Sequence, residues 1–451
     1  MCIVTHMVSS TPQFPHRLAW ASYASFAAFG VFWGTWGASI PRIRSQAGIS
    51  DGQLGTALLF IGAGALPAML LTGRIIDRFG VRITGAVTLF LLGASGLIVA
   101  LTTTGFVSLC FGLLLVGATS GAADVAINAA AGSAEKLAAT PVITHSHGMF
   151  SAFVVVSSLV TGLSTALGAG TTFSFVLAGA ASTIASGYLL SALPAEMISA
   201  PRRTKAENED LRHGRTDPAR SVPVLAILLI GILGALAFAG ENAHQSWAAV
   251  FFEDELGTGA ALSSTAPAVF AAVVAITRFS TGGLQPAHAT RTLVLGAAAA
   301  SVGATILAAA PNVILAVIGL AVAAAGTAVL YPTLLGIVSR STDDATRGRA
   351  TSLLTTISYL GFLLGPVYVG LWSEAAGLRA AMAAIAALCA VLLVLIPVLL
   401  RFRRKLTDPS STPHAANAAH HPKKDDDARK HDLAERTSPM DKHHRLTDRG
   451  L

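Results

Sequence analysis

Residues 53 to 103 contain two apolar runs on either side of a short charged connector. The first run reads QLGTALLFIGAGALPAMLLT (53–72), the connector reads Gly73-Arg74-Ile75-Ile76-Asp77-Arg78-Phe79-Gly80-Val81-Arg82, and the second run reads ITGAVTLFLLGASGLIVALTT (83–103). Each run is about as long as the ~20 residues that a helix needs to cross a ~30 Å hydrocarbon core. Because backbone groups in lipid must be satisfied within the segment, such runs predict helices. The stretch therefore predicts two membrane-spanning helices joined by a tight charged turn.

Similar apolar segments recur along the whole chain. They lie at 18–40, 106–132, 142–166, 171–193, 222–252, 261–282, 290–310, 312–338, 350–372 and 378–400. Of the 451 residues, 53% are hydrophobic and only 12% are charged, whereas a soluble domain carries about a quarter charged residues. We therefore expect an all-α membrane protein with twelve transmembrane helices.

A polar stretch divides these predicted helices six and six. We expect an N-terminal segment (1–17), an N-terminal six-helix bundle (18–193), a linker (194–221), a C-terminal six-helix bundle (222–401) and a tail (402–451). The tail is too poor in apolar residues to bury a core, so we expect it to be disordered. Two bundles joined by a linker are common among secondary transporters, whose repeats move about a site near the membrane midplane.

The basic residues predict how the chain is oriented. Twenty of the 31 Lys and Arg residues fall on one predicted face, eight lie in the tail, and only Arg42, Arg44 and Arg379 fall on the opposite face. Because cytoplasmic loops carry the excess of Lys and Arg, we expect both termini and the linker to lie in the cytoplasm and the helices to span the inner membrane. The net charge of +7 is then a consequence of topology, and we expect no nucleic-acid partner. Residues 1–16 lack the apolar core of a signal peptide.

The connector at 73–82 has a sequence with known relatives. Gly73 and Gly80 permit close approach and positive φ, while Asp77 can face a helix N-terminus and the arginines can pair with acids or helix carbonyls. It could serve simply as a charged connector that sets topology. In its position after the second helix it resembles the signature loop of the major facilitator superfamily, G-x-x-x-D-R-x-G-R-R. The match covers Gly73, Asp77, Arg78, Gly80 and Arg82 and departs at Val81.

This resemblance extends over residues 18 to 401 and implies a twelve-helix facilitator fold in which the signature loop, residues 73–82, is a gating motif. Residues 278–286, at the corresponding place in the second half, keep an arginine and glycines but no acid. The stretches 37–44, 124–128 and 145–151 resemble a bacterial sub-group of sugar-permease-like facilitators, mostly of unknown substrate.

Two acids stand inside predicted spans, Asp124 in the inner half of the fourth helix and Glu241 in the outer half of the seventh. Each costs ~2.5–3.5 kcal/mol on insertion scales and is a functional candidate by default. We expect no Lys or Arg at mid-depth to neutralise either acid, so each must be protonated, hydrated or hydrogen-bonded, and could exchange protons. Asn128 shares the helix face of Asp124. This pair forms a coupling or substrate site, or else Asp124 pairs with Arg78 or Arg82 and latches the gate, as the resemblance implies.

Glu241, His244 and Gln245 fall on one helix face by their i, i+3 and i+4 spacing. They form either a proton relay or substrate-binding face, or a hydrated outer mouth with a satisfied Glu–His pair. Glu-x-x-His also recurs in the metal sites of helix bundles, but the second motif that such sites need is absent. The cysteines Cys2, Cys110 and Cys389 are widely separated, so we expect neither a metal nor another cofactor.

Three aromatic residues complete the candidate site. Trp33, Trp36 and Tyr331 lie inside predicted spans and either line a central cavity or anchor the helices at the membrane interface.

Together these features predict a secondary active transporter that moves a small solute by alternating access. We expect coupling to protons and a monomer. Without a nucleophile–base pair or an ATP-binding loop, an enzyme is not expected. Two alternatives stay open: an efflux pump for drugs or metabolites, and a receptor of the same fold that has lost transport.

Overall fold

The computed structural model describes residues 14–192, 224–281, 286–342 and 344–407. The predicted linker, almost all of the N-terminal segment and most of the tail lie outside these residues. By its internal contacts the chain forms two units, Met1–Phe402 and Arg403–Leu451. In the described ranges, all the helical stretches that could cross a membrane lie in the first unit.

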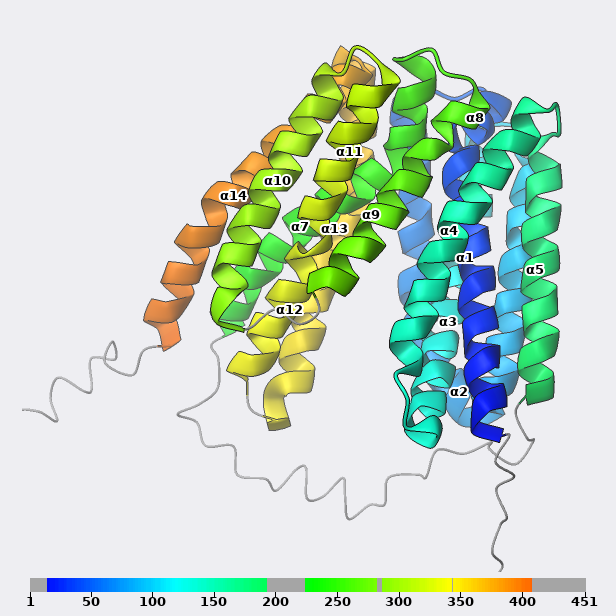
Figure 1. Cartoon of the computed structure of the whole chain (residues 1–451), viewed down its shortest axis with the longest axis horizontal. Coiled ribbons are helices and arrows are strands. Elements are labelled where there is room, and N and C mark those ends of the chain that lie inside the picture. The colour runs from blue at the N-terminus through cyan, green and yellow to red at the C-terminus, as the bar shows by residue number, and fades with distance from the viewer. Residues whose placement is uncertain (1–13, 193–223, 282–285, 343, 408–451) are drawn as a thin grey trace, which may run out of the picture. The chain divides into compact units, whose positions relative to one another are not determined.

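The described chain is helical in both halves (Figure 1). The N-terminal half holds α1 (Phe14–Ala47), α2 (Asp51–Thr102), α3 (Phe106–Ala138), α4 (Val142–Ala166) and α5 (Thr171–Ala192). The C-terminal half holds α7 (Val224–Asp254), α8 (Ala260–Ser263), α9 (Thr265–Thr281), the short 3₁₀ helix η2 (Pro286–His288), α10 (Ala289–Ala309), α11 (Val313–Ala328), α12 (Leu330–Ser341), α13 (Asp344–Ala376) and α14 (Leu378–Thr407).

The helices are consistent with twelve membrane crossings. Ten helices in the described ranges are long and apolar enough to cross a membrane. One of them, α2, has 52 residues and is interrupted at Gly80 (φ 80°, ψ 157°); at ~1.5 Å per residue it is far too long for one crossing, so it supplies the two predicted spans at 53–72 and 83–103. The helix α1 is not among the ten but packs against α3, α4 and α5, and a helix so enclosed needs less apolar surface than one facing lipid.

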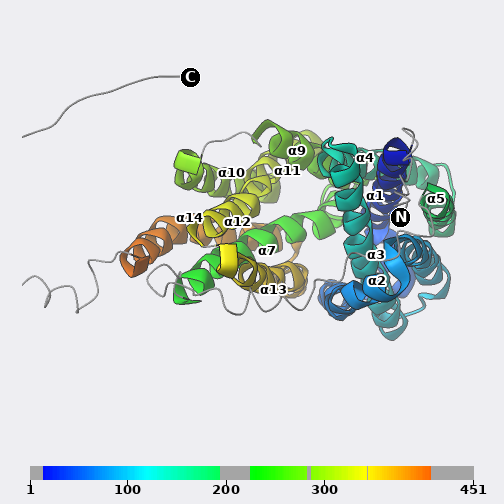
Figure 2. The ribbon, with the colours of Figure 1, turned by 90° about the horizontal axis from the view of Figure 1, so that it is seen from below.

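The connections define two ends of the helices. One end, which we call the short-loop end, holds six short connections of the described chain. They are 48–50, 103–105, 167–170, 255–259, 310–312 and residue 377. At the other end, the linker end, α5 finishes and α7 begins, and Figure 2 looks onto this end. Ser50 helps to start α2 at the short-loop end, because its side chain and that of Gln53 bond reciprocally to the backbone in a capping box.

Neighbouring helices are closely joined in both halves. A Cβ at Gly117 of α3 would lie 1.9 Å from the Ile61 carbonyl oxygen of α2, so the two backbones touch, as small residues allow in membrane helices. In the C-terminal half, Pro366 within α13 cannot donate to the carbonyl of Phe362 four residues earlier. Asn242 Nδ2 of α7 donates to that carbonyl at 2.6 Å. Both halves are therefore built from tightly paired helices.

Candidate functional site

Glu241 lies near the middle of α7, with only 7% of the residue exposed. Its Oε1 accepts a hydrogen bond from Arg278 Nη2 at 3.0 Å. The expectation that no basic residue neutralises this acid is therefore wrong. Arg278 belongs to the last turn of α9, and a long side chain can carry its charge well away from its own backbone. Glu241 is thus one member of a neutral pair.

The neighbours of Glu241 do not form one shared polar face. His244 is fully buried; its Nδ1 is 2.7 Å from the Gly240 carbonyl oxygen, and its ring stacks on that of Phe270 with the centroids 6.3 Å apart. Its Nε2 is buried without a hydrogen-bond partner in the described structure. Gln245 is exposed. Glu241, His244 and Gln245 do lie at helical spacing. Their side chains nevertheless have different surroundings, because Glu241 pairs with Arg278, His244 is buried against Phe270 and Gln245 is exposed.

Asp124 lies in α3 and is bound by Asn128, as its spacing predicted. Asn128 Nδ2 donates to Asp124 Oδ1 at 3.0 Å and to the Asp124 carbonyl oxygen at 2.9 Å. Within the described residues no ion pair joins Asp124 to Arg78 or Arg82. Asn128 is therefore the bonded partner of Asp124 in the described structure.

Tyr331 belongs to a group of four aromatic side chains in the C-terminal half. Phe238 stacks on Tyr331 with ring centroids 4.1 Å apart and meets Tyr359 and Phe362 edge-on at 5.7 and 6.1 Å. Sequence reasoning missed Phe238, Tyr359 and Phe362. A signal was available, because Phe238 lies three residues before Glu241 on the same helical face. We call the six residues Asp124, Asn128, Phe238, Tyr331, Tyr359 and Phe362 the central cluster.

A break in the predicted tenth span lies beside the central cluster. The segment at 312–338, expected as one span, is one apolar stretch long enough to cross a membrane, with an irregular turn at Val329 between α11, which ends at Ala328, and α12, which begins at Leu330. Arg278 Nε donates to the Ala328 carbonyl oxygen at 3.2 Å, so the same guanidinium group binds Glu241 and the end of α11. Irregular backbone at membrane depth persists where protein or water satisfies it, and broken helices often border transporter binding sites. Tyr331 stands in the first turn after this break.

The two tryptophans lie within the N-terminal half. Trp36 is 4% exposed and belongs to the core. Trp33 is half-buried and packs edge-on against Phe29 and Phe32, with ring centroids 6.3 and 5.7 Å away. Neither residue is brought into ring contact with the four aromatic side chains of the central cluster.

The signature loop forms the turn inside α2 at the linker end. Gly80 adopts the positive φ of 80° that was expected, a conformation open to glycine. Gly73 does not adopt a positive φ, because it is part of the helix. The close approach predicted for it is also wrong, because a Cβ at Gly73 would meet no atom within 4 Å. Asp77 and Arg78 are exposed and make no ion pair among the described residues. Arg82 Nε is buried without a hydrogen-bond partner there.

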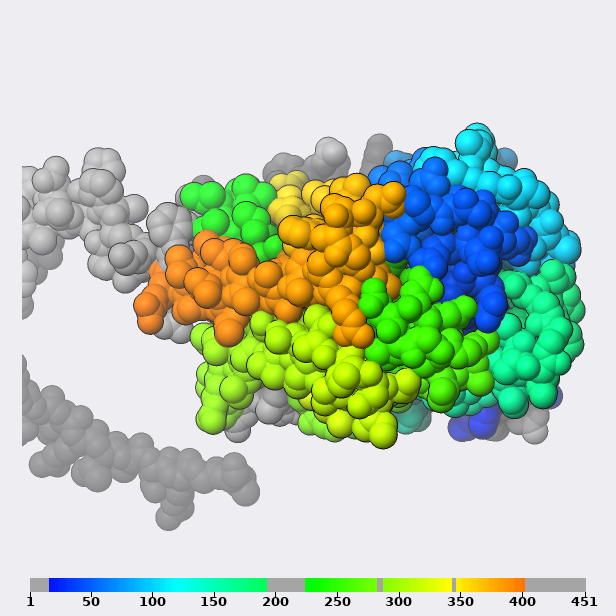
Figure 3. Space-filling model, turned by 90° about the horizontal axis from the view of Figure 1, so that it is seen from above, coloured from blue at the N-terminus to red at the C-terminus, as the bar shows by residue number. Residues whose placement is uncertain are grey.

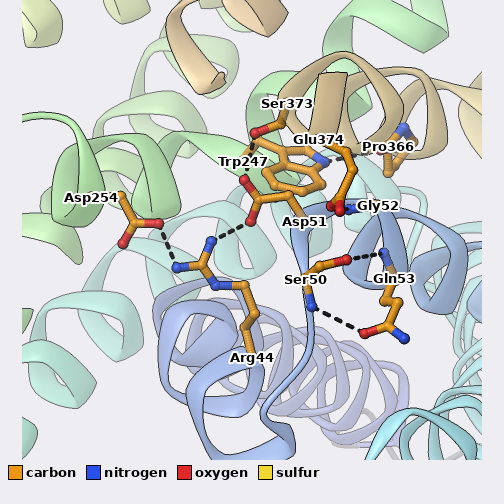
Figure 4. Close-up of polar contacts among 10 residues, drawn as sticks. All are labelled: Arg44, Ser50, Asp51, Gly52, Gln53, Trp247, Asp254, Pro366, Ser373 and Glu374. Carbon is orange, nitrogen blue, oxygen red and sulfur yellow. Dashed lines mark hydrogen bonds and ion pairs between the residues drawn. The ribbon is translucent and has the colours of Figure 1, made fainter. Parts of the chain in front are cut away.

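A network of charged and polar groups joins the two halves at the short-loop end (Figure 4). Arg44 of α1 binds Asp51 of α2 and Asp254 of α7. The Ser373 hydroxyl of α13 donates to Asp51, and Glu374 accepts a hydrogen bond from the Gly52 backbone N–H at 3.0 Å. We call these six residues the short-loop network. Figure 3 looks onto this end, where the two halves are in contact.

The sequence places both basic and acidic residues at the end of the helices where this network lies. Arg42 and Arg44 are basic residues on the sparsely charged face, and Asp51, Glu253 and Asp254 also lie near predicted helix ends on that face. Opposite charges at one end of a bundle can pair, but which acid meets which arginine depends on how the halves dock.

Among the described residues, no three His, Cys, Asp or Glu side chains gather in a way that could hold a metal ion.

Comparison with known proteins places the chain among transport proteins. The model of the Major Facilitator Superfamily matches residues 21–289 and 287–432. An uncharacterized MFS-type transporter of Yersinia pestis is 26% identical over 359 residues, which cover 77% of this chain and 87% of the relative. The membrane protein MosC of Rhizobium meliloti is 26% identical over 349 residues, covering 76% of this chain and 81% of MosC.

Solved structures agree in fold. The nucleoside transporter NupG superposes with a TM-score of 0.67 at 14% identity, covering 86% of this chain and 99% of NupG. The D-xylose-proton symporter superposes with a TM-score of 0.65 at 15% identity, covering 84% of this chain and 97% of the symporter. At such low identity these likenesses speak only for the arrangement of the helices.

Proposed function

We propose, since the chain belongs to the major facilitator superfamily, that it is a secondary active transporter which moves a small solute by alternating access. The chain is a multi-pass membrane protein, and its relatives are transporters rather than enzymes. In this proposal the solute binds at the central cluster, and its transport is coupled to the movement of protons. The excess of basic residues at the linker end supports a cytoplasmic position for that end, and hence cytoplasmic termini in the inner membrane.

One observation carries this proposal: the two halves are joined at one end, where Arg44 of α1 binds Asp254 of α7. A solute that touched residues of both halves at the central cluster could favour one arrangement of the halves over another through its binding energy. The halves are tied by ion pairs at the short-loop end, whereas the signature loop at the linker end makes none among the described residues. Such an arrangement is suited to opening the central cluster toward one end at a time.

The two acids at mid-depth receive different roles in this proposal. Glu241 is paired with Arg278 at 3.0 Å, so its charge is already balanced, and it holds Arg278 at the end of α11. Asp124 has Asn128 as its bonded partner and no cation among the described residues. We therefore assign proton uptake and release to Asp124. His244 and Gln245 stay secondary candidates, as neither bonds Glu241.

The test is solute movement by the purified full chain in proteoliposomes with an inward proton gradient. Uridine and D-xylose are the first probes, because fold relatives are named as carriers of nucleosides and D-xylose. A ligand that binds the folded protein stabilises it by mass action. The probe that stabilises the protein in thermal unfolding is therefore the one used in the transport assay. We expect its accumulation to exceed that of protein-free vesicles, to collapse with a protonophore and to be lost in Asp124→Asn. Coupled transport by Asp124→Asn at the wild-type rate would remove the role of this acid.

A receptor that has lost transport is the second candidate. It is favoured by Val81, where the signature loop usually has a basic residue, and by the lack of an acid at 278–286. Counterflow separates the two functions, because a receptor would bind a probe without exchanging it across the membrane.

A further inference from the structure

The charges around the central cluster do not balance. The two acids at mid-depth contribute two negative charges when ionised, and Arg278 neutralises Glu241. Within the described residues no arginine or lysine pairs with Asp124. An ionised carboxylate in such surroundings is stabilised by a partner of opposite charge. Asp124, when ionised, therefore has no balancing positive charge among the described residues.

The hydrogen bonds of Asn128 show which atoms the cluster offers to a ligand. Its side-chain nitrogen has two N–H groups and donates to both Asp124 Oδ1 and the Asp124 carbonyl oxygen. Both donors are thus occupied. The pair offers to a ligand the second carboxylate oxygen of Asp124 and the amide oxygen of Asn128, which are acceptors only. A ligand that binds here must supply donors.

The aromatic side chains of the cluster favour the same kind of ligand. The Thr355 hydroxyl donates to the Thr351 carbonyl oxygen at 2.8 Å, so the Tyr331 hydroxyl, 2.9 Å from Thr355 Oγ1, is the donor of that bond. Tyr331 and Tyr359 then present rings whose faces attract cations.

We propose that the transported solute carries a protonated amine, which binds at Asp124 and Asn128. The ammonium group donates to the Asp124 and Asn128 oxygens. This inference rests on the proposed function, since it names the substrate class of the same site. A proton and the amine would compete for Asp124, so an amine would exchange with protons, and its accumulation in proteoliposomes would need the proton gradient directed outward instead of inward.

The experiment compares amines with neutral molecules of the same shape on the purified full chain in detergent. The probes are 2-phenylethylamine with 2-phenylethanol, and D-glucosamine with D-glucose, because each pair exchanges an amine for a hydroxyl. Binding is followed by thermal unfolding and by titration calorimetry. We expect the amine of at least one pair to bind with a Kd at least tenfold below that of its alcohol.

Two variants locate the preference. Asp124→Asn keeps an oxygen acceptor for Asn128 but removes the charge, and should abolish the amine preference. Glu135→Gln removes one negative charge from the same helix and can still accept the bond that Glu135 takes from the Ile143 N–H at 2.9 Å, so it should keep the preference. Equal affinity for both members of each pair, no binding by either amine, or a preference retained in Asp124→Asn would overturn the proposal.

The outcome can be separated from that of the proposed function. If the amine preference depends on Asp124 but counterflow of the same amine is absent, the chain is an amine receptor and transport fails. If a neutral solute is transported with the proton gradient while both amines are ignored, transport stands and the substrate class proposed here fails.

Discussion

At the short-loop end, Arg44 binds Asp254 across the two halves while Asp51 and Gly52 of α2 meet Ser373 and Glu374 of α13. At the linker end, Asp77 and Arg78 of the signature loop are exposed and make no ion pair among the described residues. The short-loop network thus joins the halves by charge, whereas the described signature loop does not. If the chain works by alternating access, as we propose, the structure corresponds to the state in which the short-loop end is closed. A variant at either end should change the balance between the ends, and a variant within one half should leave it alone.

The largest effect is expected from Arg44→Gln. Arg44 is bonded to two carboxylates, and its side chain is only 19% exposed. Hydrogen bonds to charged groups are worth about 1.5–3 kcal/mol, so we expect a shift of about 2–3 kcal/mol, or roughly 30- to 150-fold in population, toward separation of the short-loop end. The readout is the distance between spin labels at Leu167 and Leu262, exposed residues of opposite halves at this end. An unchanged distance distribution would mean that Arg44 does not hold this end.

Gly370→Ala tests the same end by packing rather than charge. A Cβ at Gly370 would lie 2.7 Å from the Asp51 carbonyl oxygen and 2.9 Å from Gly55 Cα, and backbone atoms cannot move aside without parting α2 from α13. Overpacking of this kind costs about 1–3 kcal/mol. The added methyl should therefore favour separation of the short-loop end, seen with the same labels. Gly187→Ala is the matched control, because its Cβ would meet nothing within 4 Å; equal behaviour of the two variants would contradict the packing argument.

Asn242→Ala should weaken the fold without favouring either end. Asn242 donates to the Phe362 carbonyl oxygen at 2.6 Å, a contact between α7 and α13 that lies within one half. An unsatisfied carbonyl costs about 1–3 kcal/mol, and we expect about 1–2 kcal/mol here. Thermal unfolding in detergent should show a lower Tm, while the label distances at both ends stay as in the wild type. A changed distance would show that this contact belongs to the gate.

The smallest effect is expected from Arg42→Gln. Its ion pair with Glu253 also joins the halves but is longer, at 3.4 Å, with side-chain exposures of 42% and 22%. Exposed pairs contribute about 0–1 kcal/mol. The label distance at the short-loop end should therefore change far less than in Arg44→Gln, and a response as large as that one would mean that total charge, not geometry, holds this end.

Much of the fold could be predicted because apolar runs and turns are local properties of the sequence. The spans at 53–72 and 83–103 are the two arms of α2, and the turn between them needs the positive φ that Gly80 adopts. Family membership was likewise carried by the short motif at 73–82 and is confirmed by the match over nearly the whole membrane region.

Contacts between distant helices could not be predicted in the same way. Pairing of Glu241 with Arg278 depends on the reach of a side chain from α9 to α7, which hydropathy cannot show. The interruption at Val329 did have a local signal, because Pro332 has no N–H to bond the Ala328 carbonyl four residues earlier, but the bond of that carbonyl to Arg278 could not be foreseen. Tyr359 was overlooked because a lone aromatic residue in a span has the same pattern whether it faces lipid, a neighbouring helix or a solute; only Phe238 had a signal, its spacing to Glu241.

The central claim is that the two ends open alternately, and paired distance measurements test it most directly. Spin labels would be placed at Leu167 and Leu262 for the short-loop end and at Thr140 and Gly348 for the linker end, in a chain whose Cys2, Cys110 and Cys389 are replaced by serine. Electron paramagnetic resonance would then be recorded across pH, with and without 2-phenylethylamine. We predict a second population in which the short-loop distance is longer and the linker-end distance shorter, with the two changing together. Two distances that stay single and constant, or that lengthen together, would contradict alternating access in this protein.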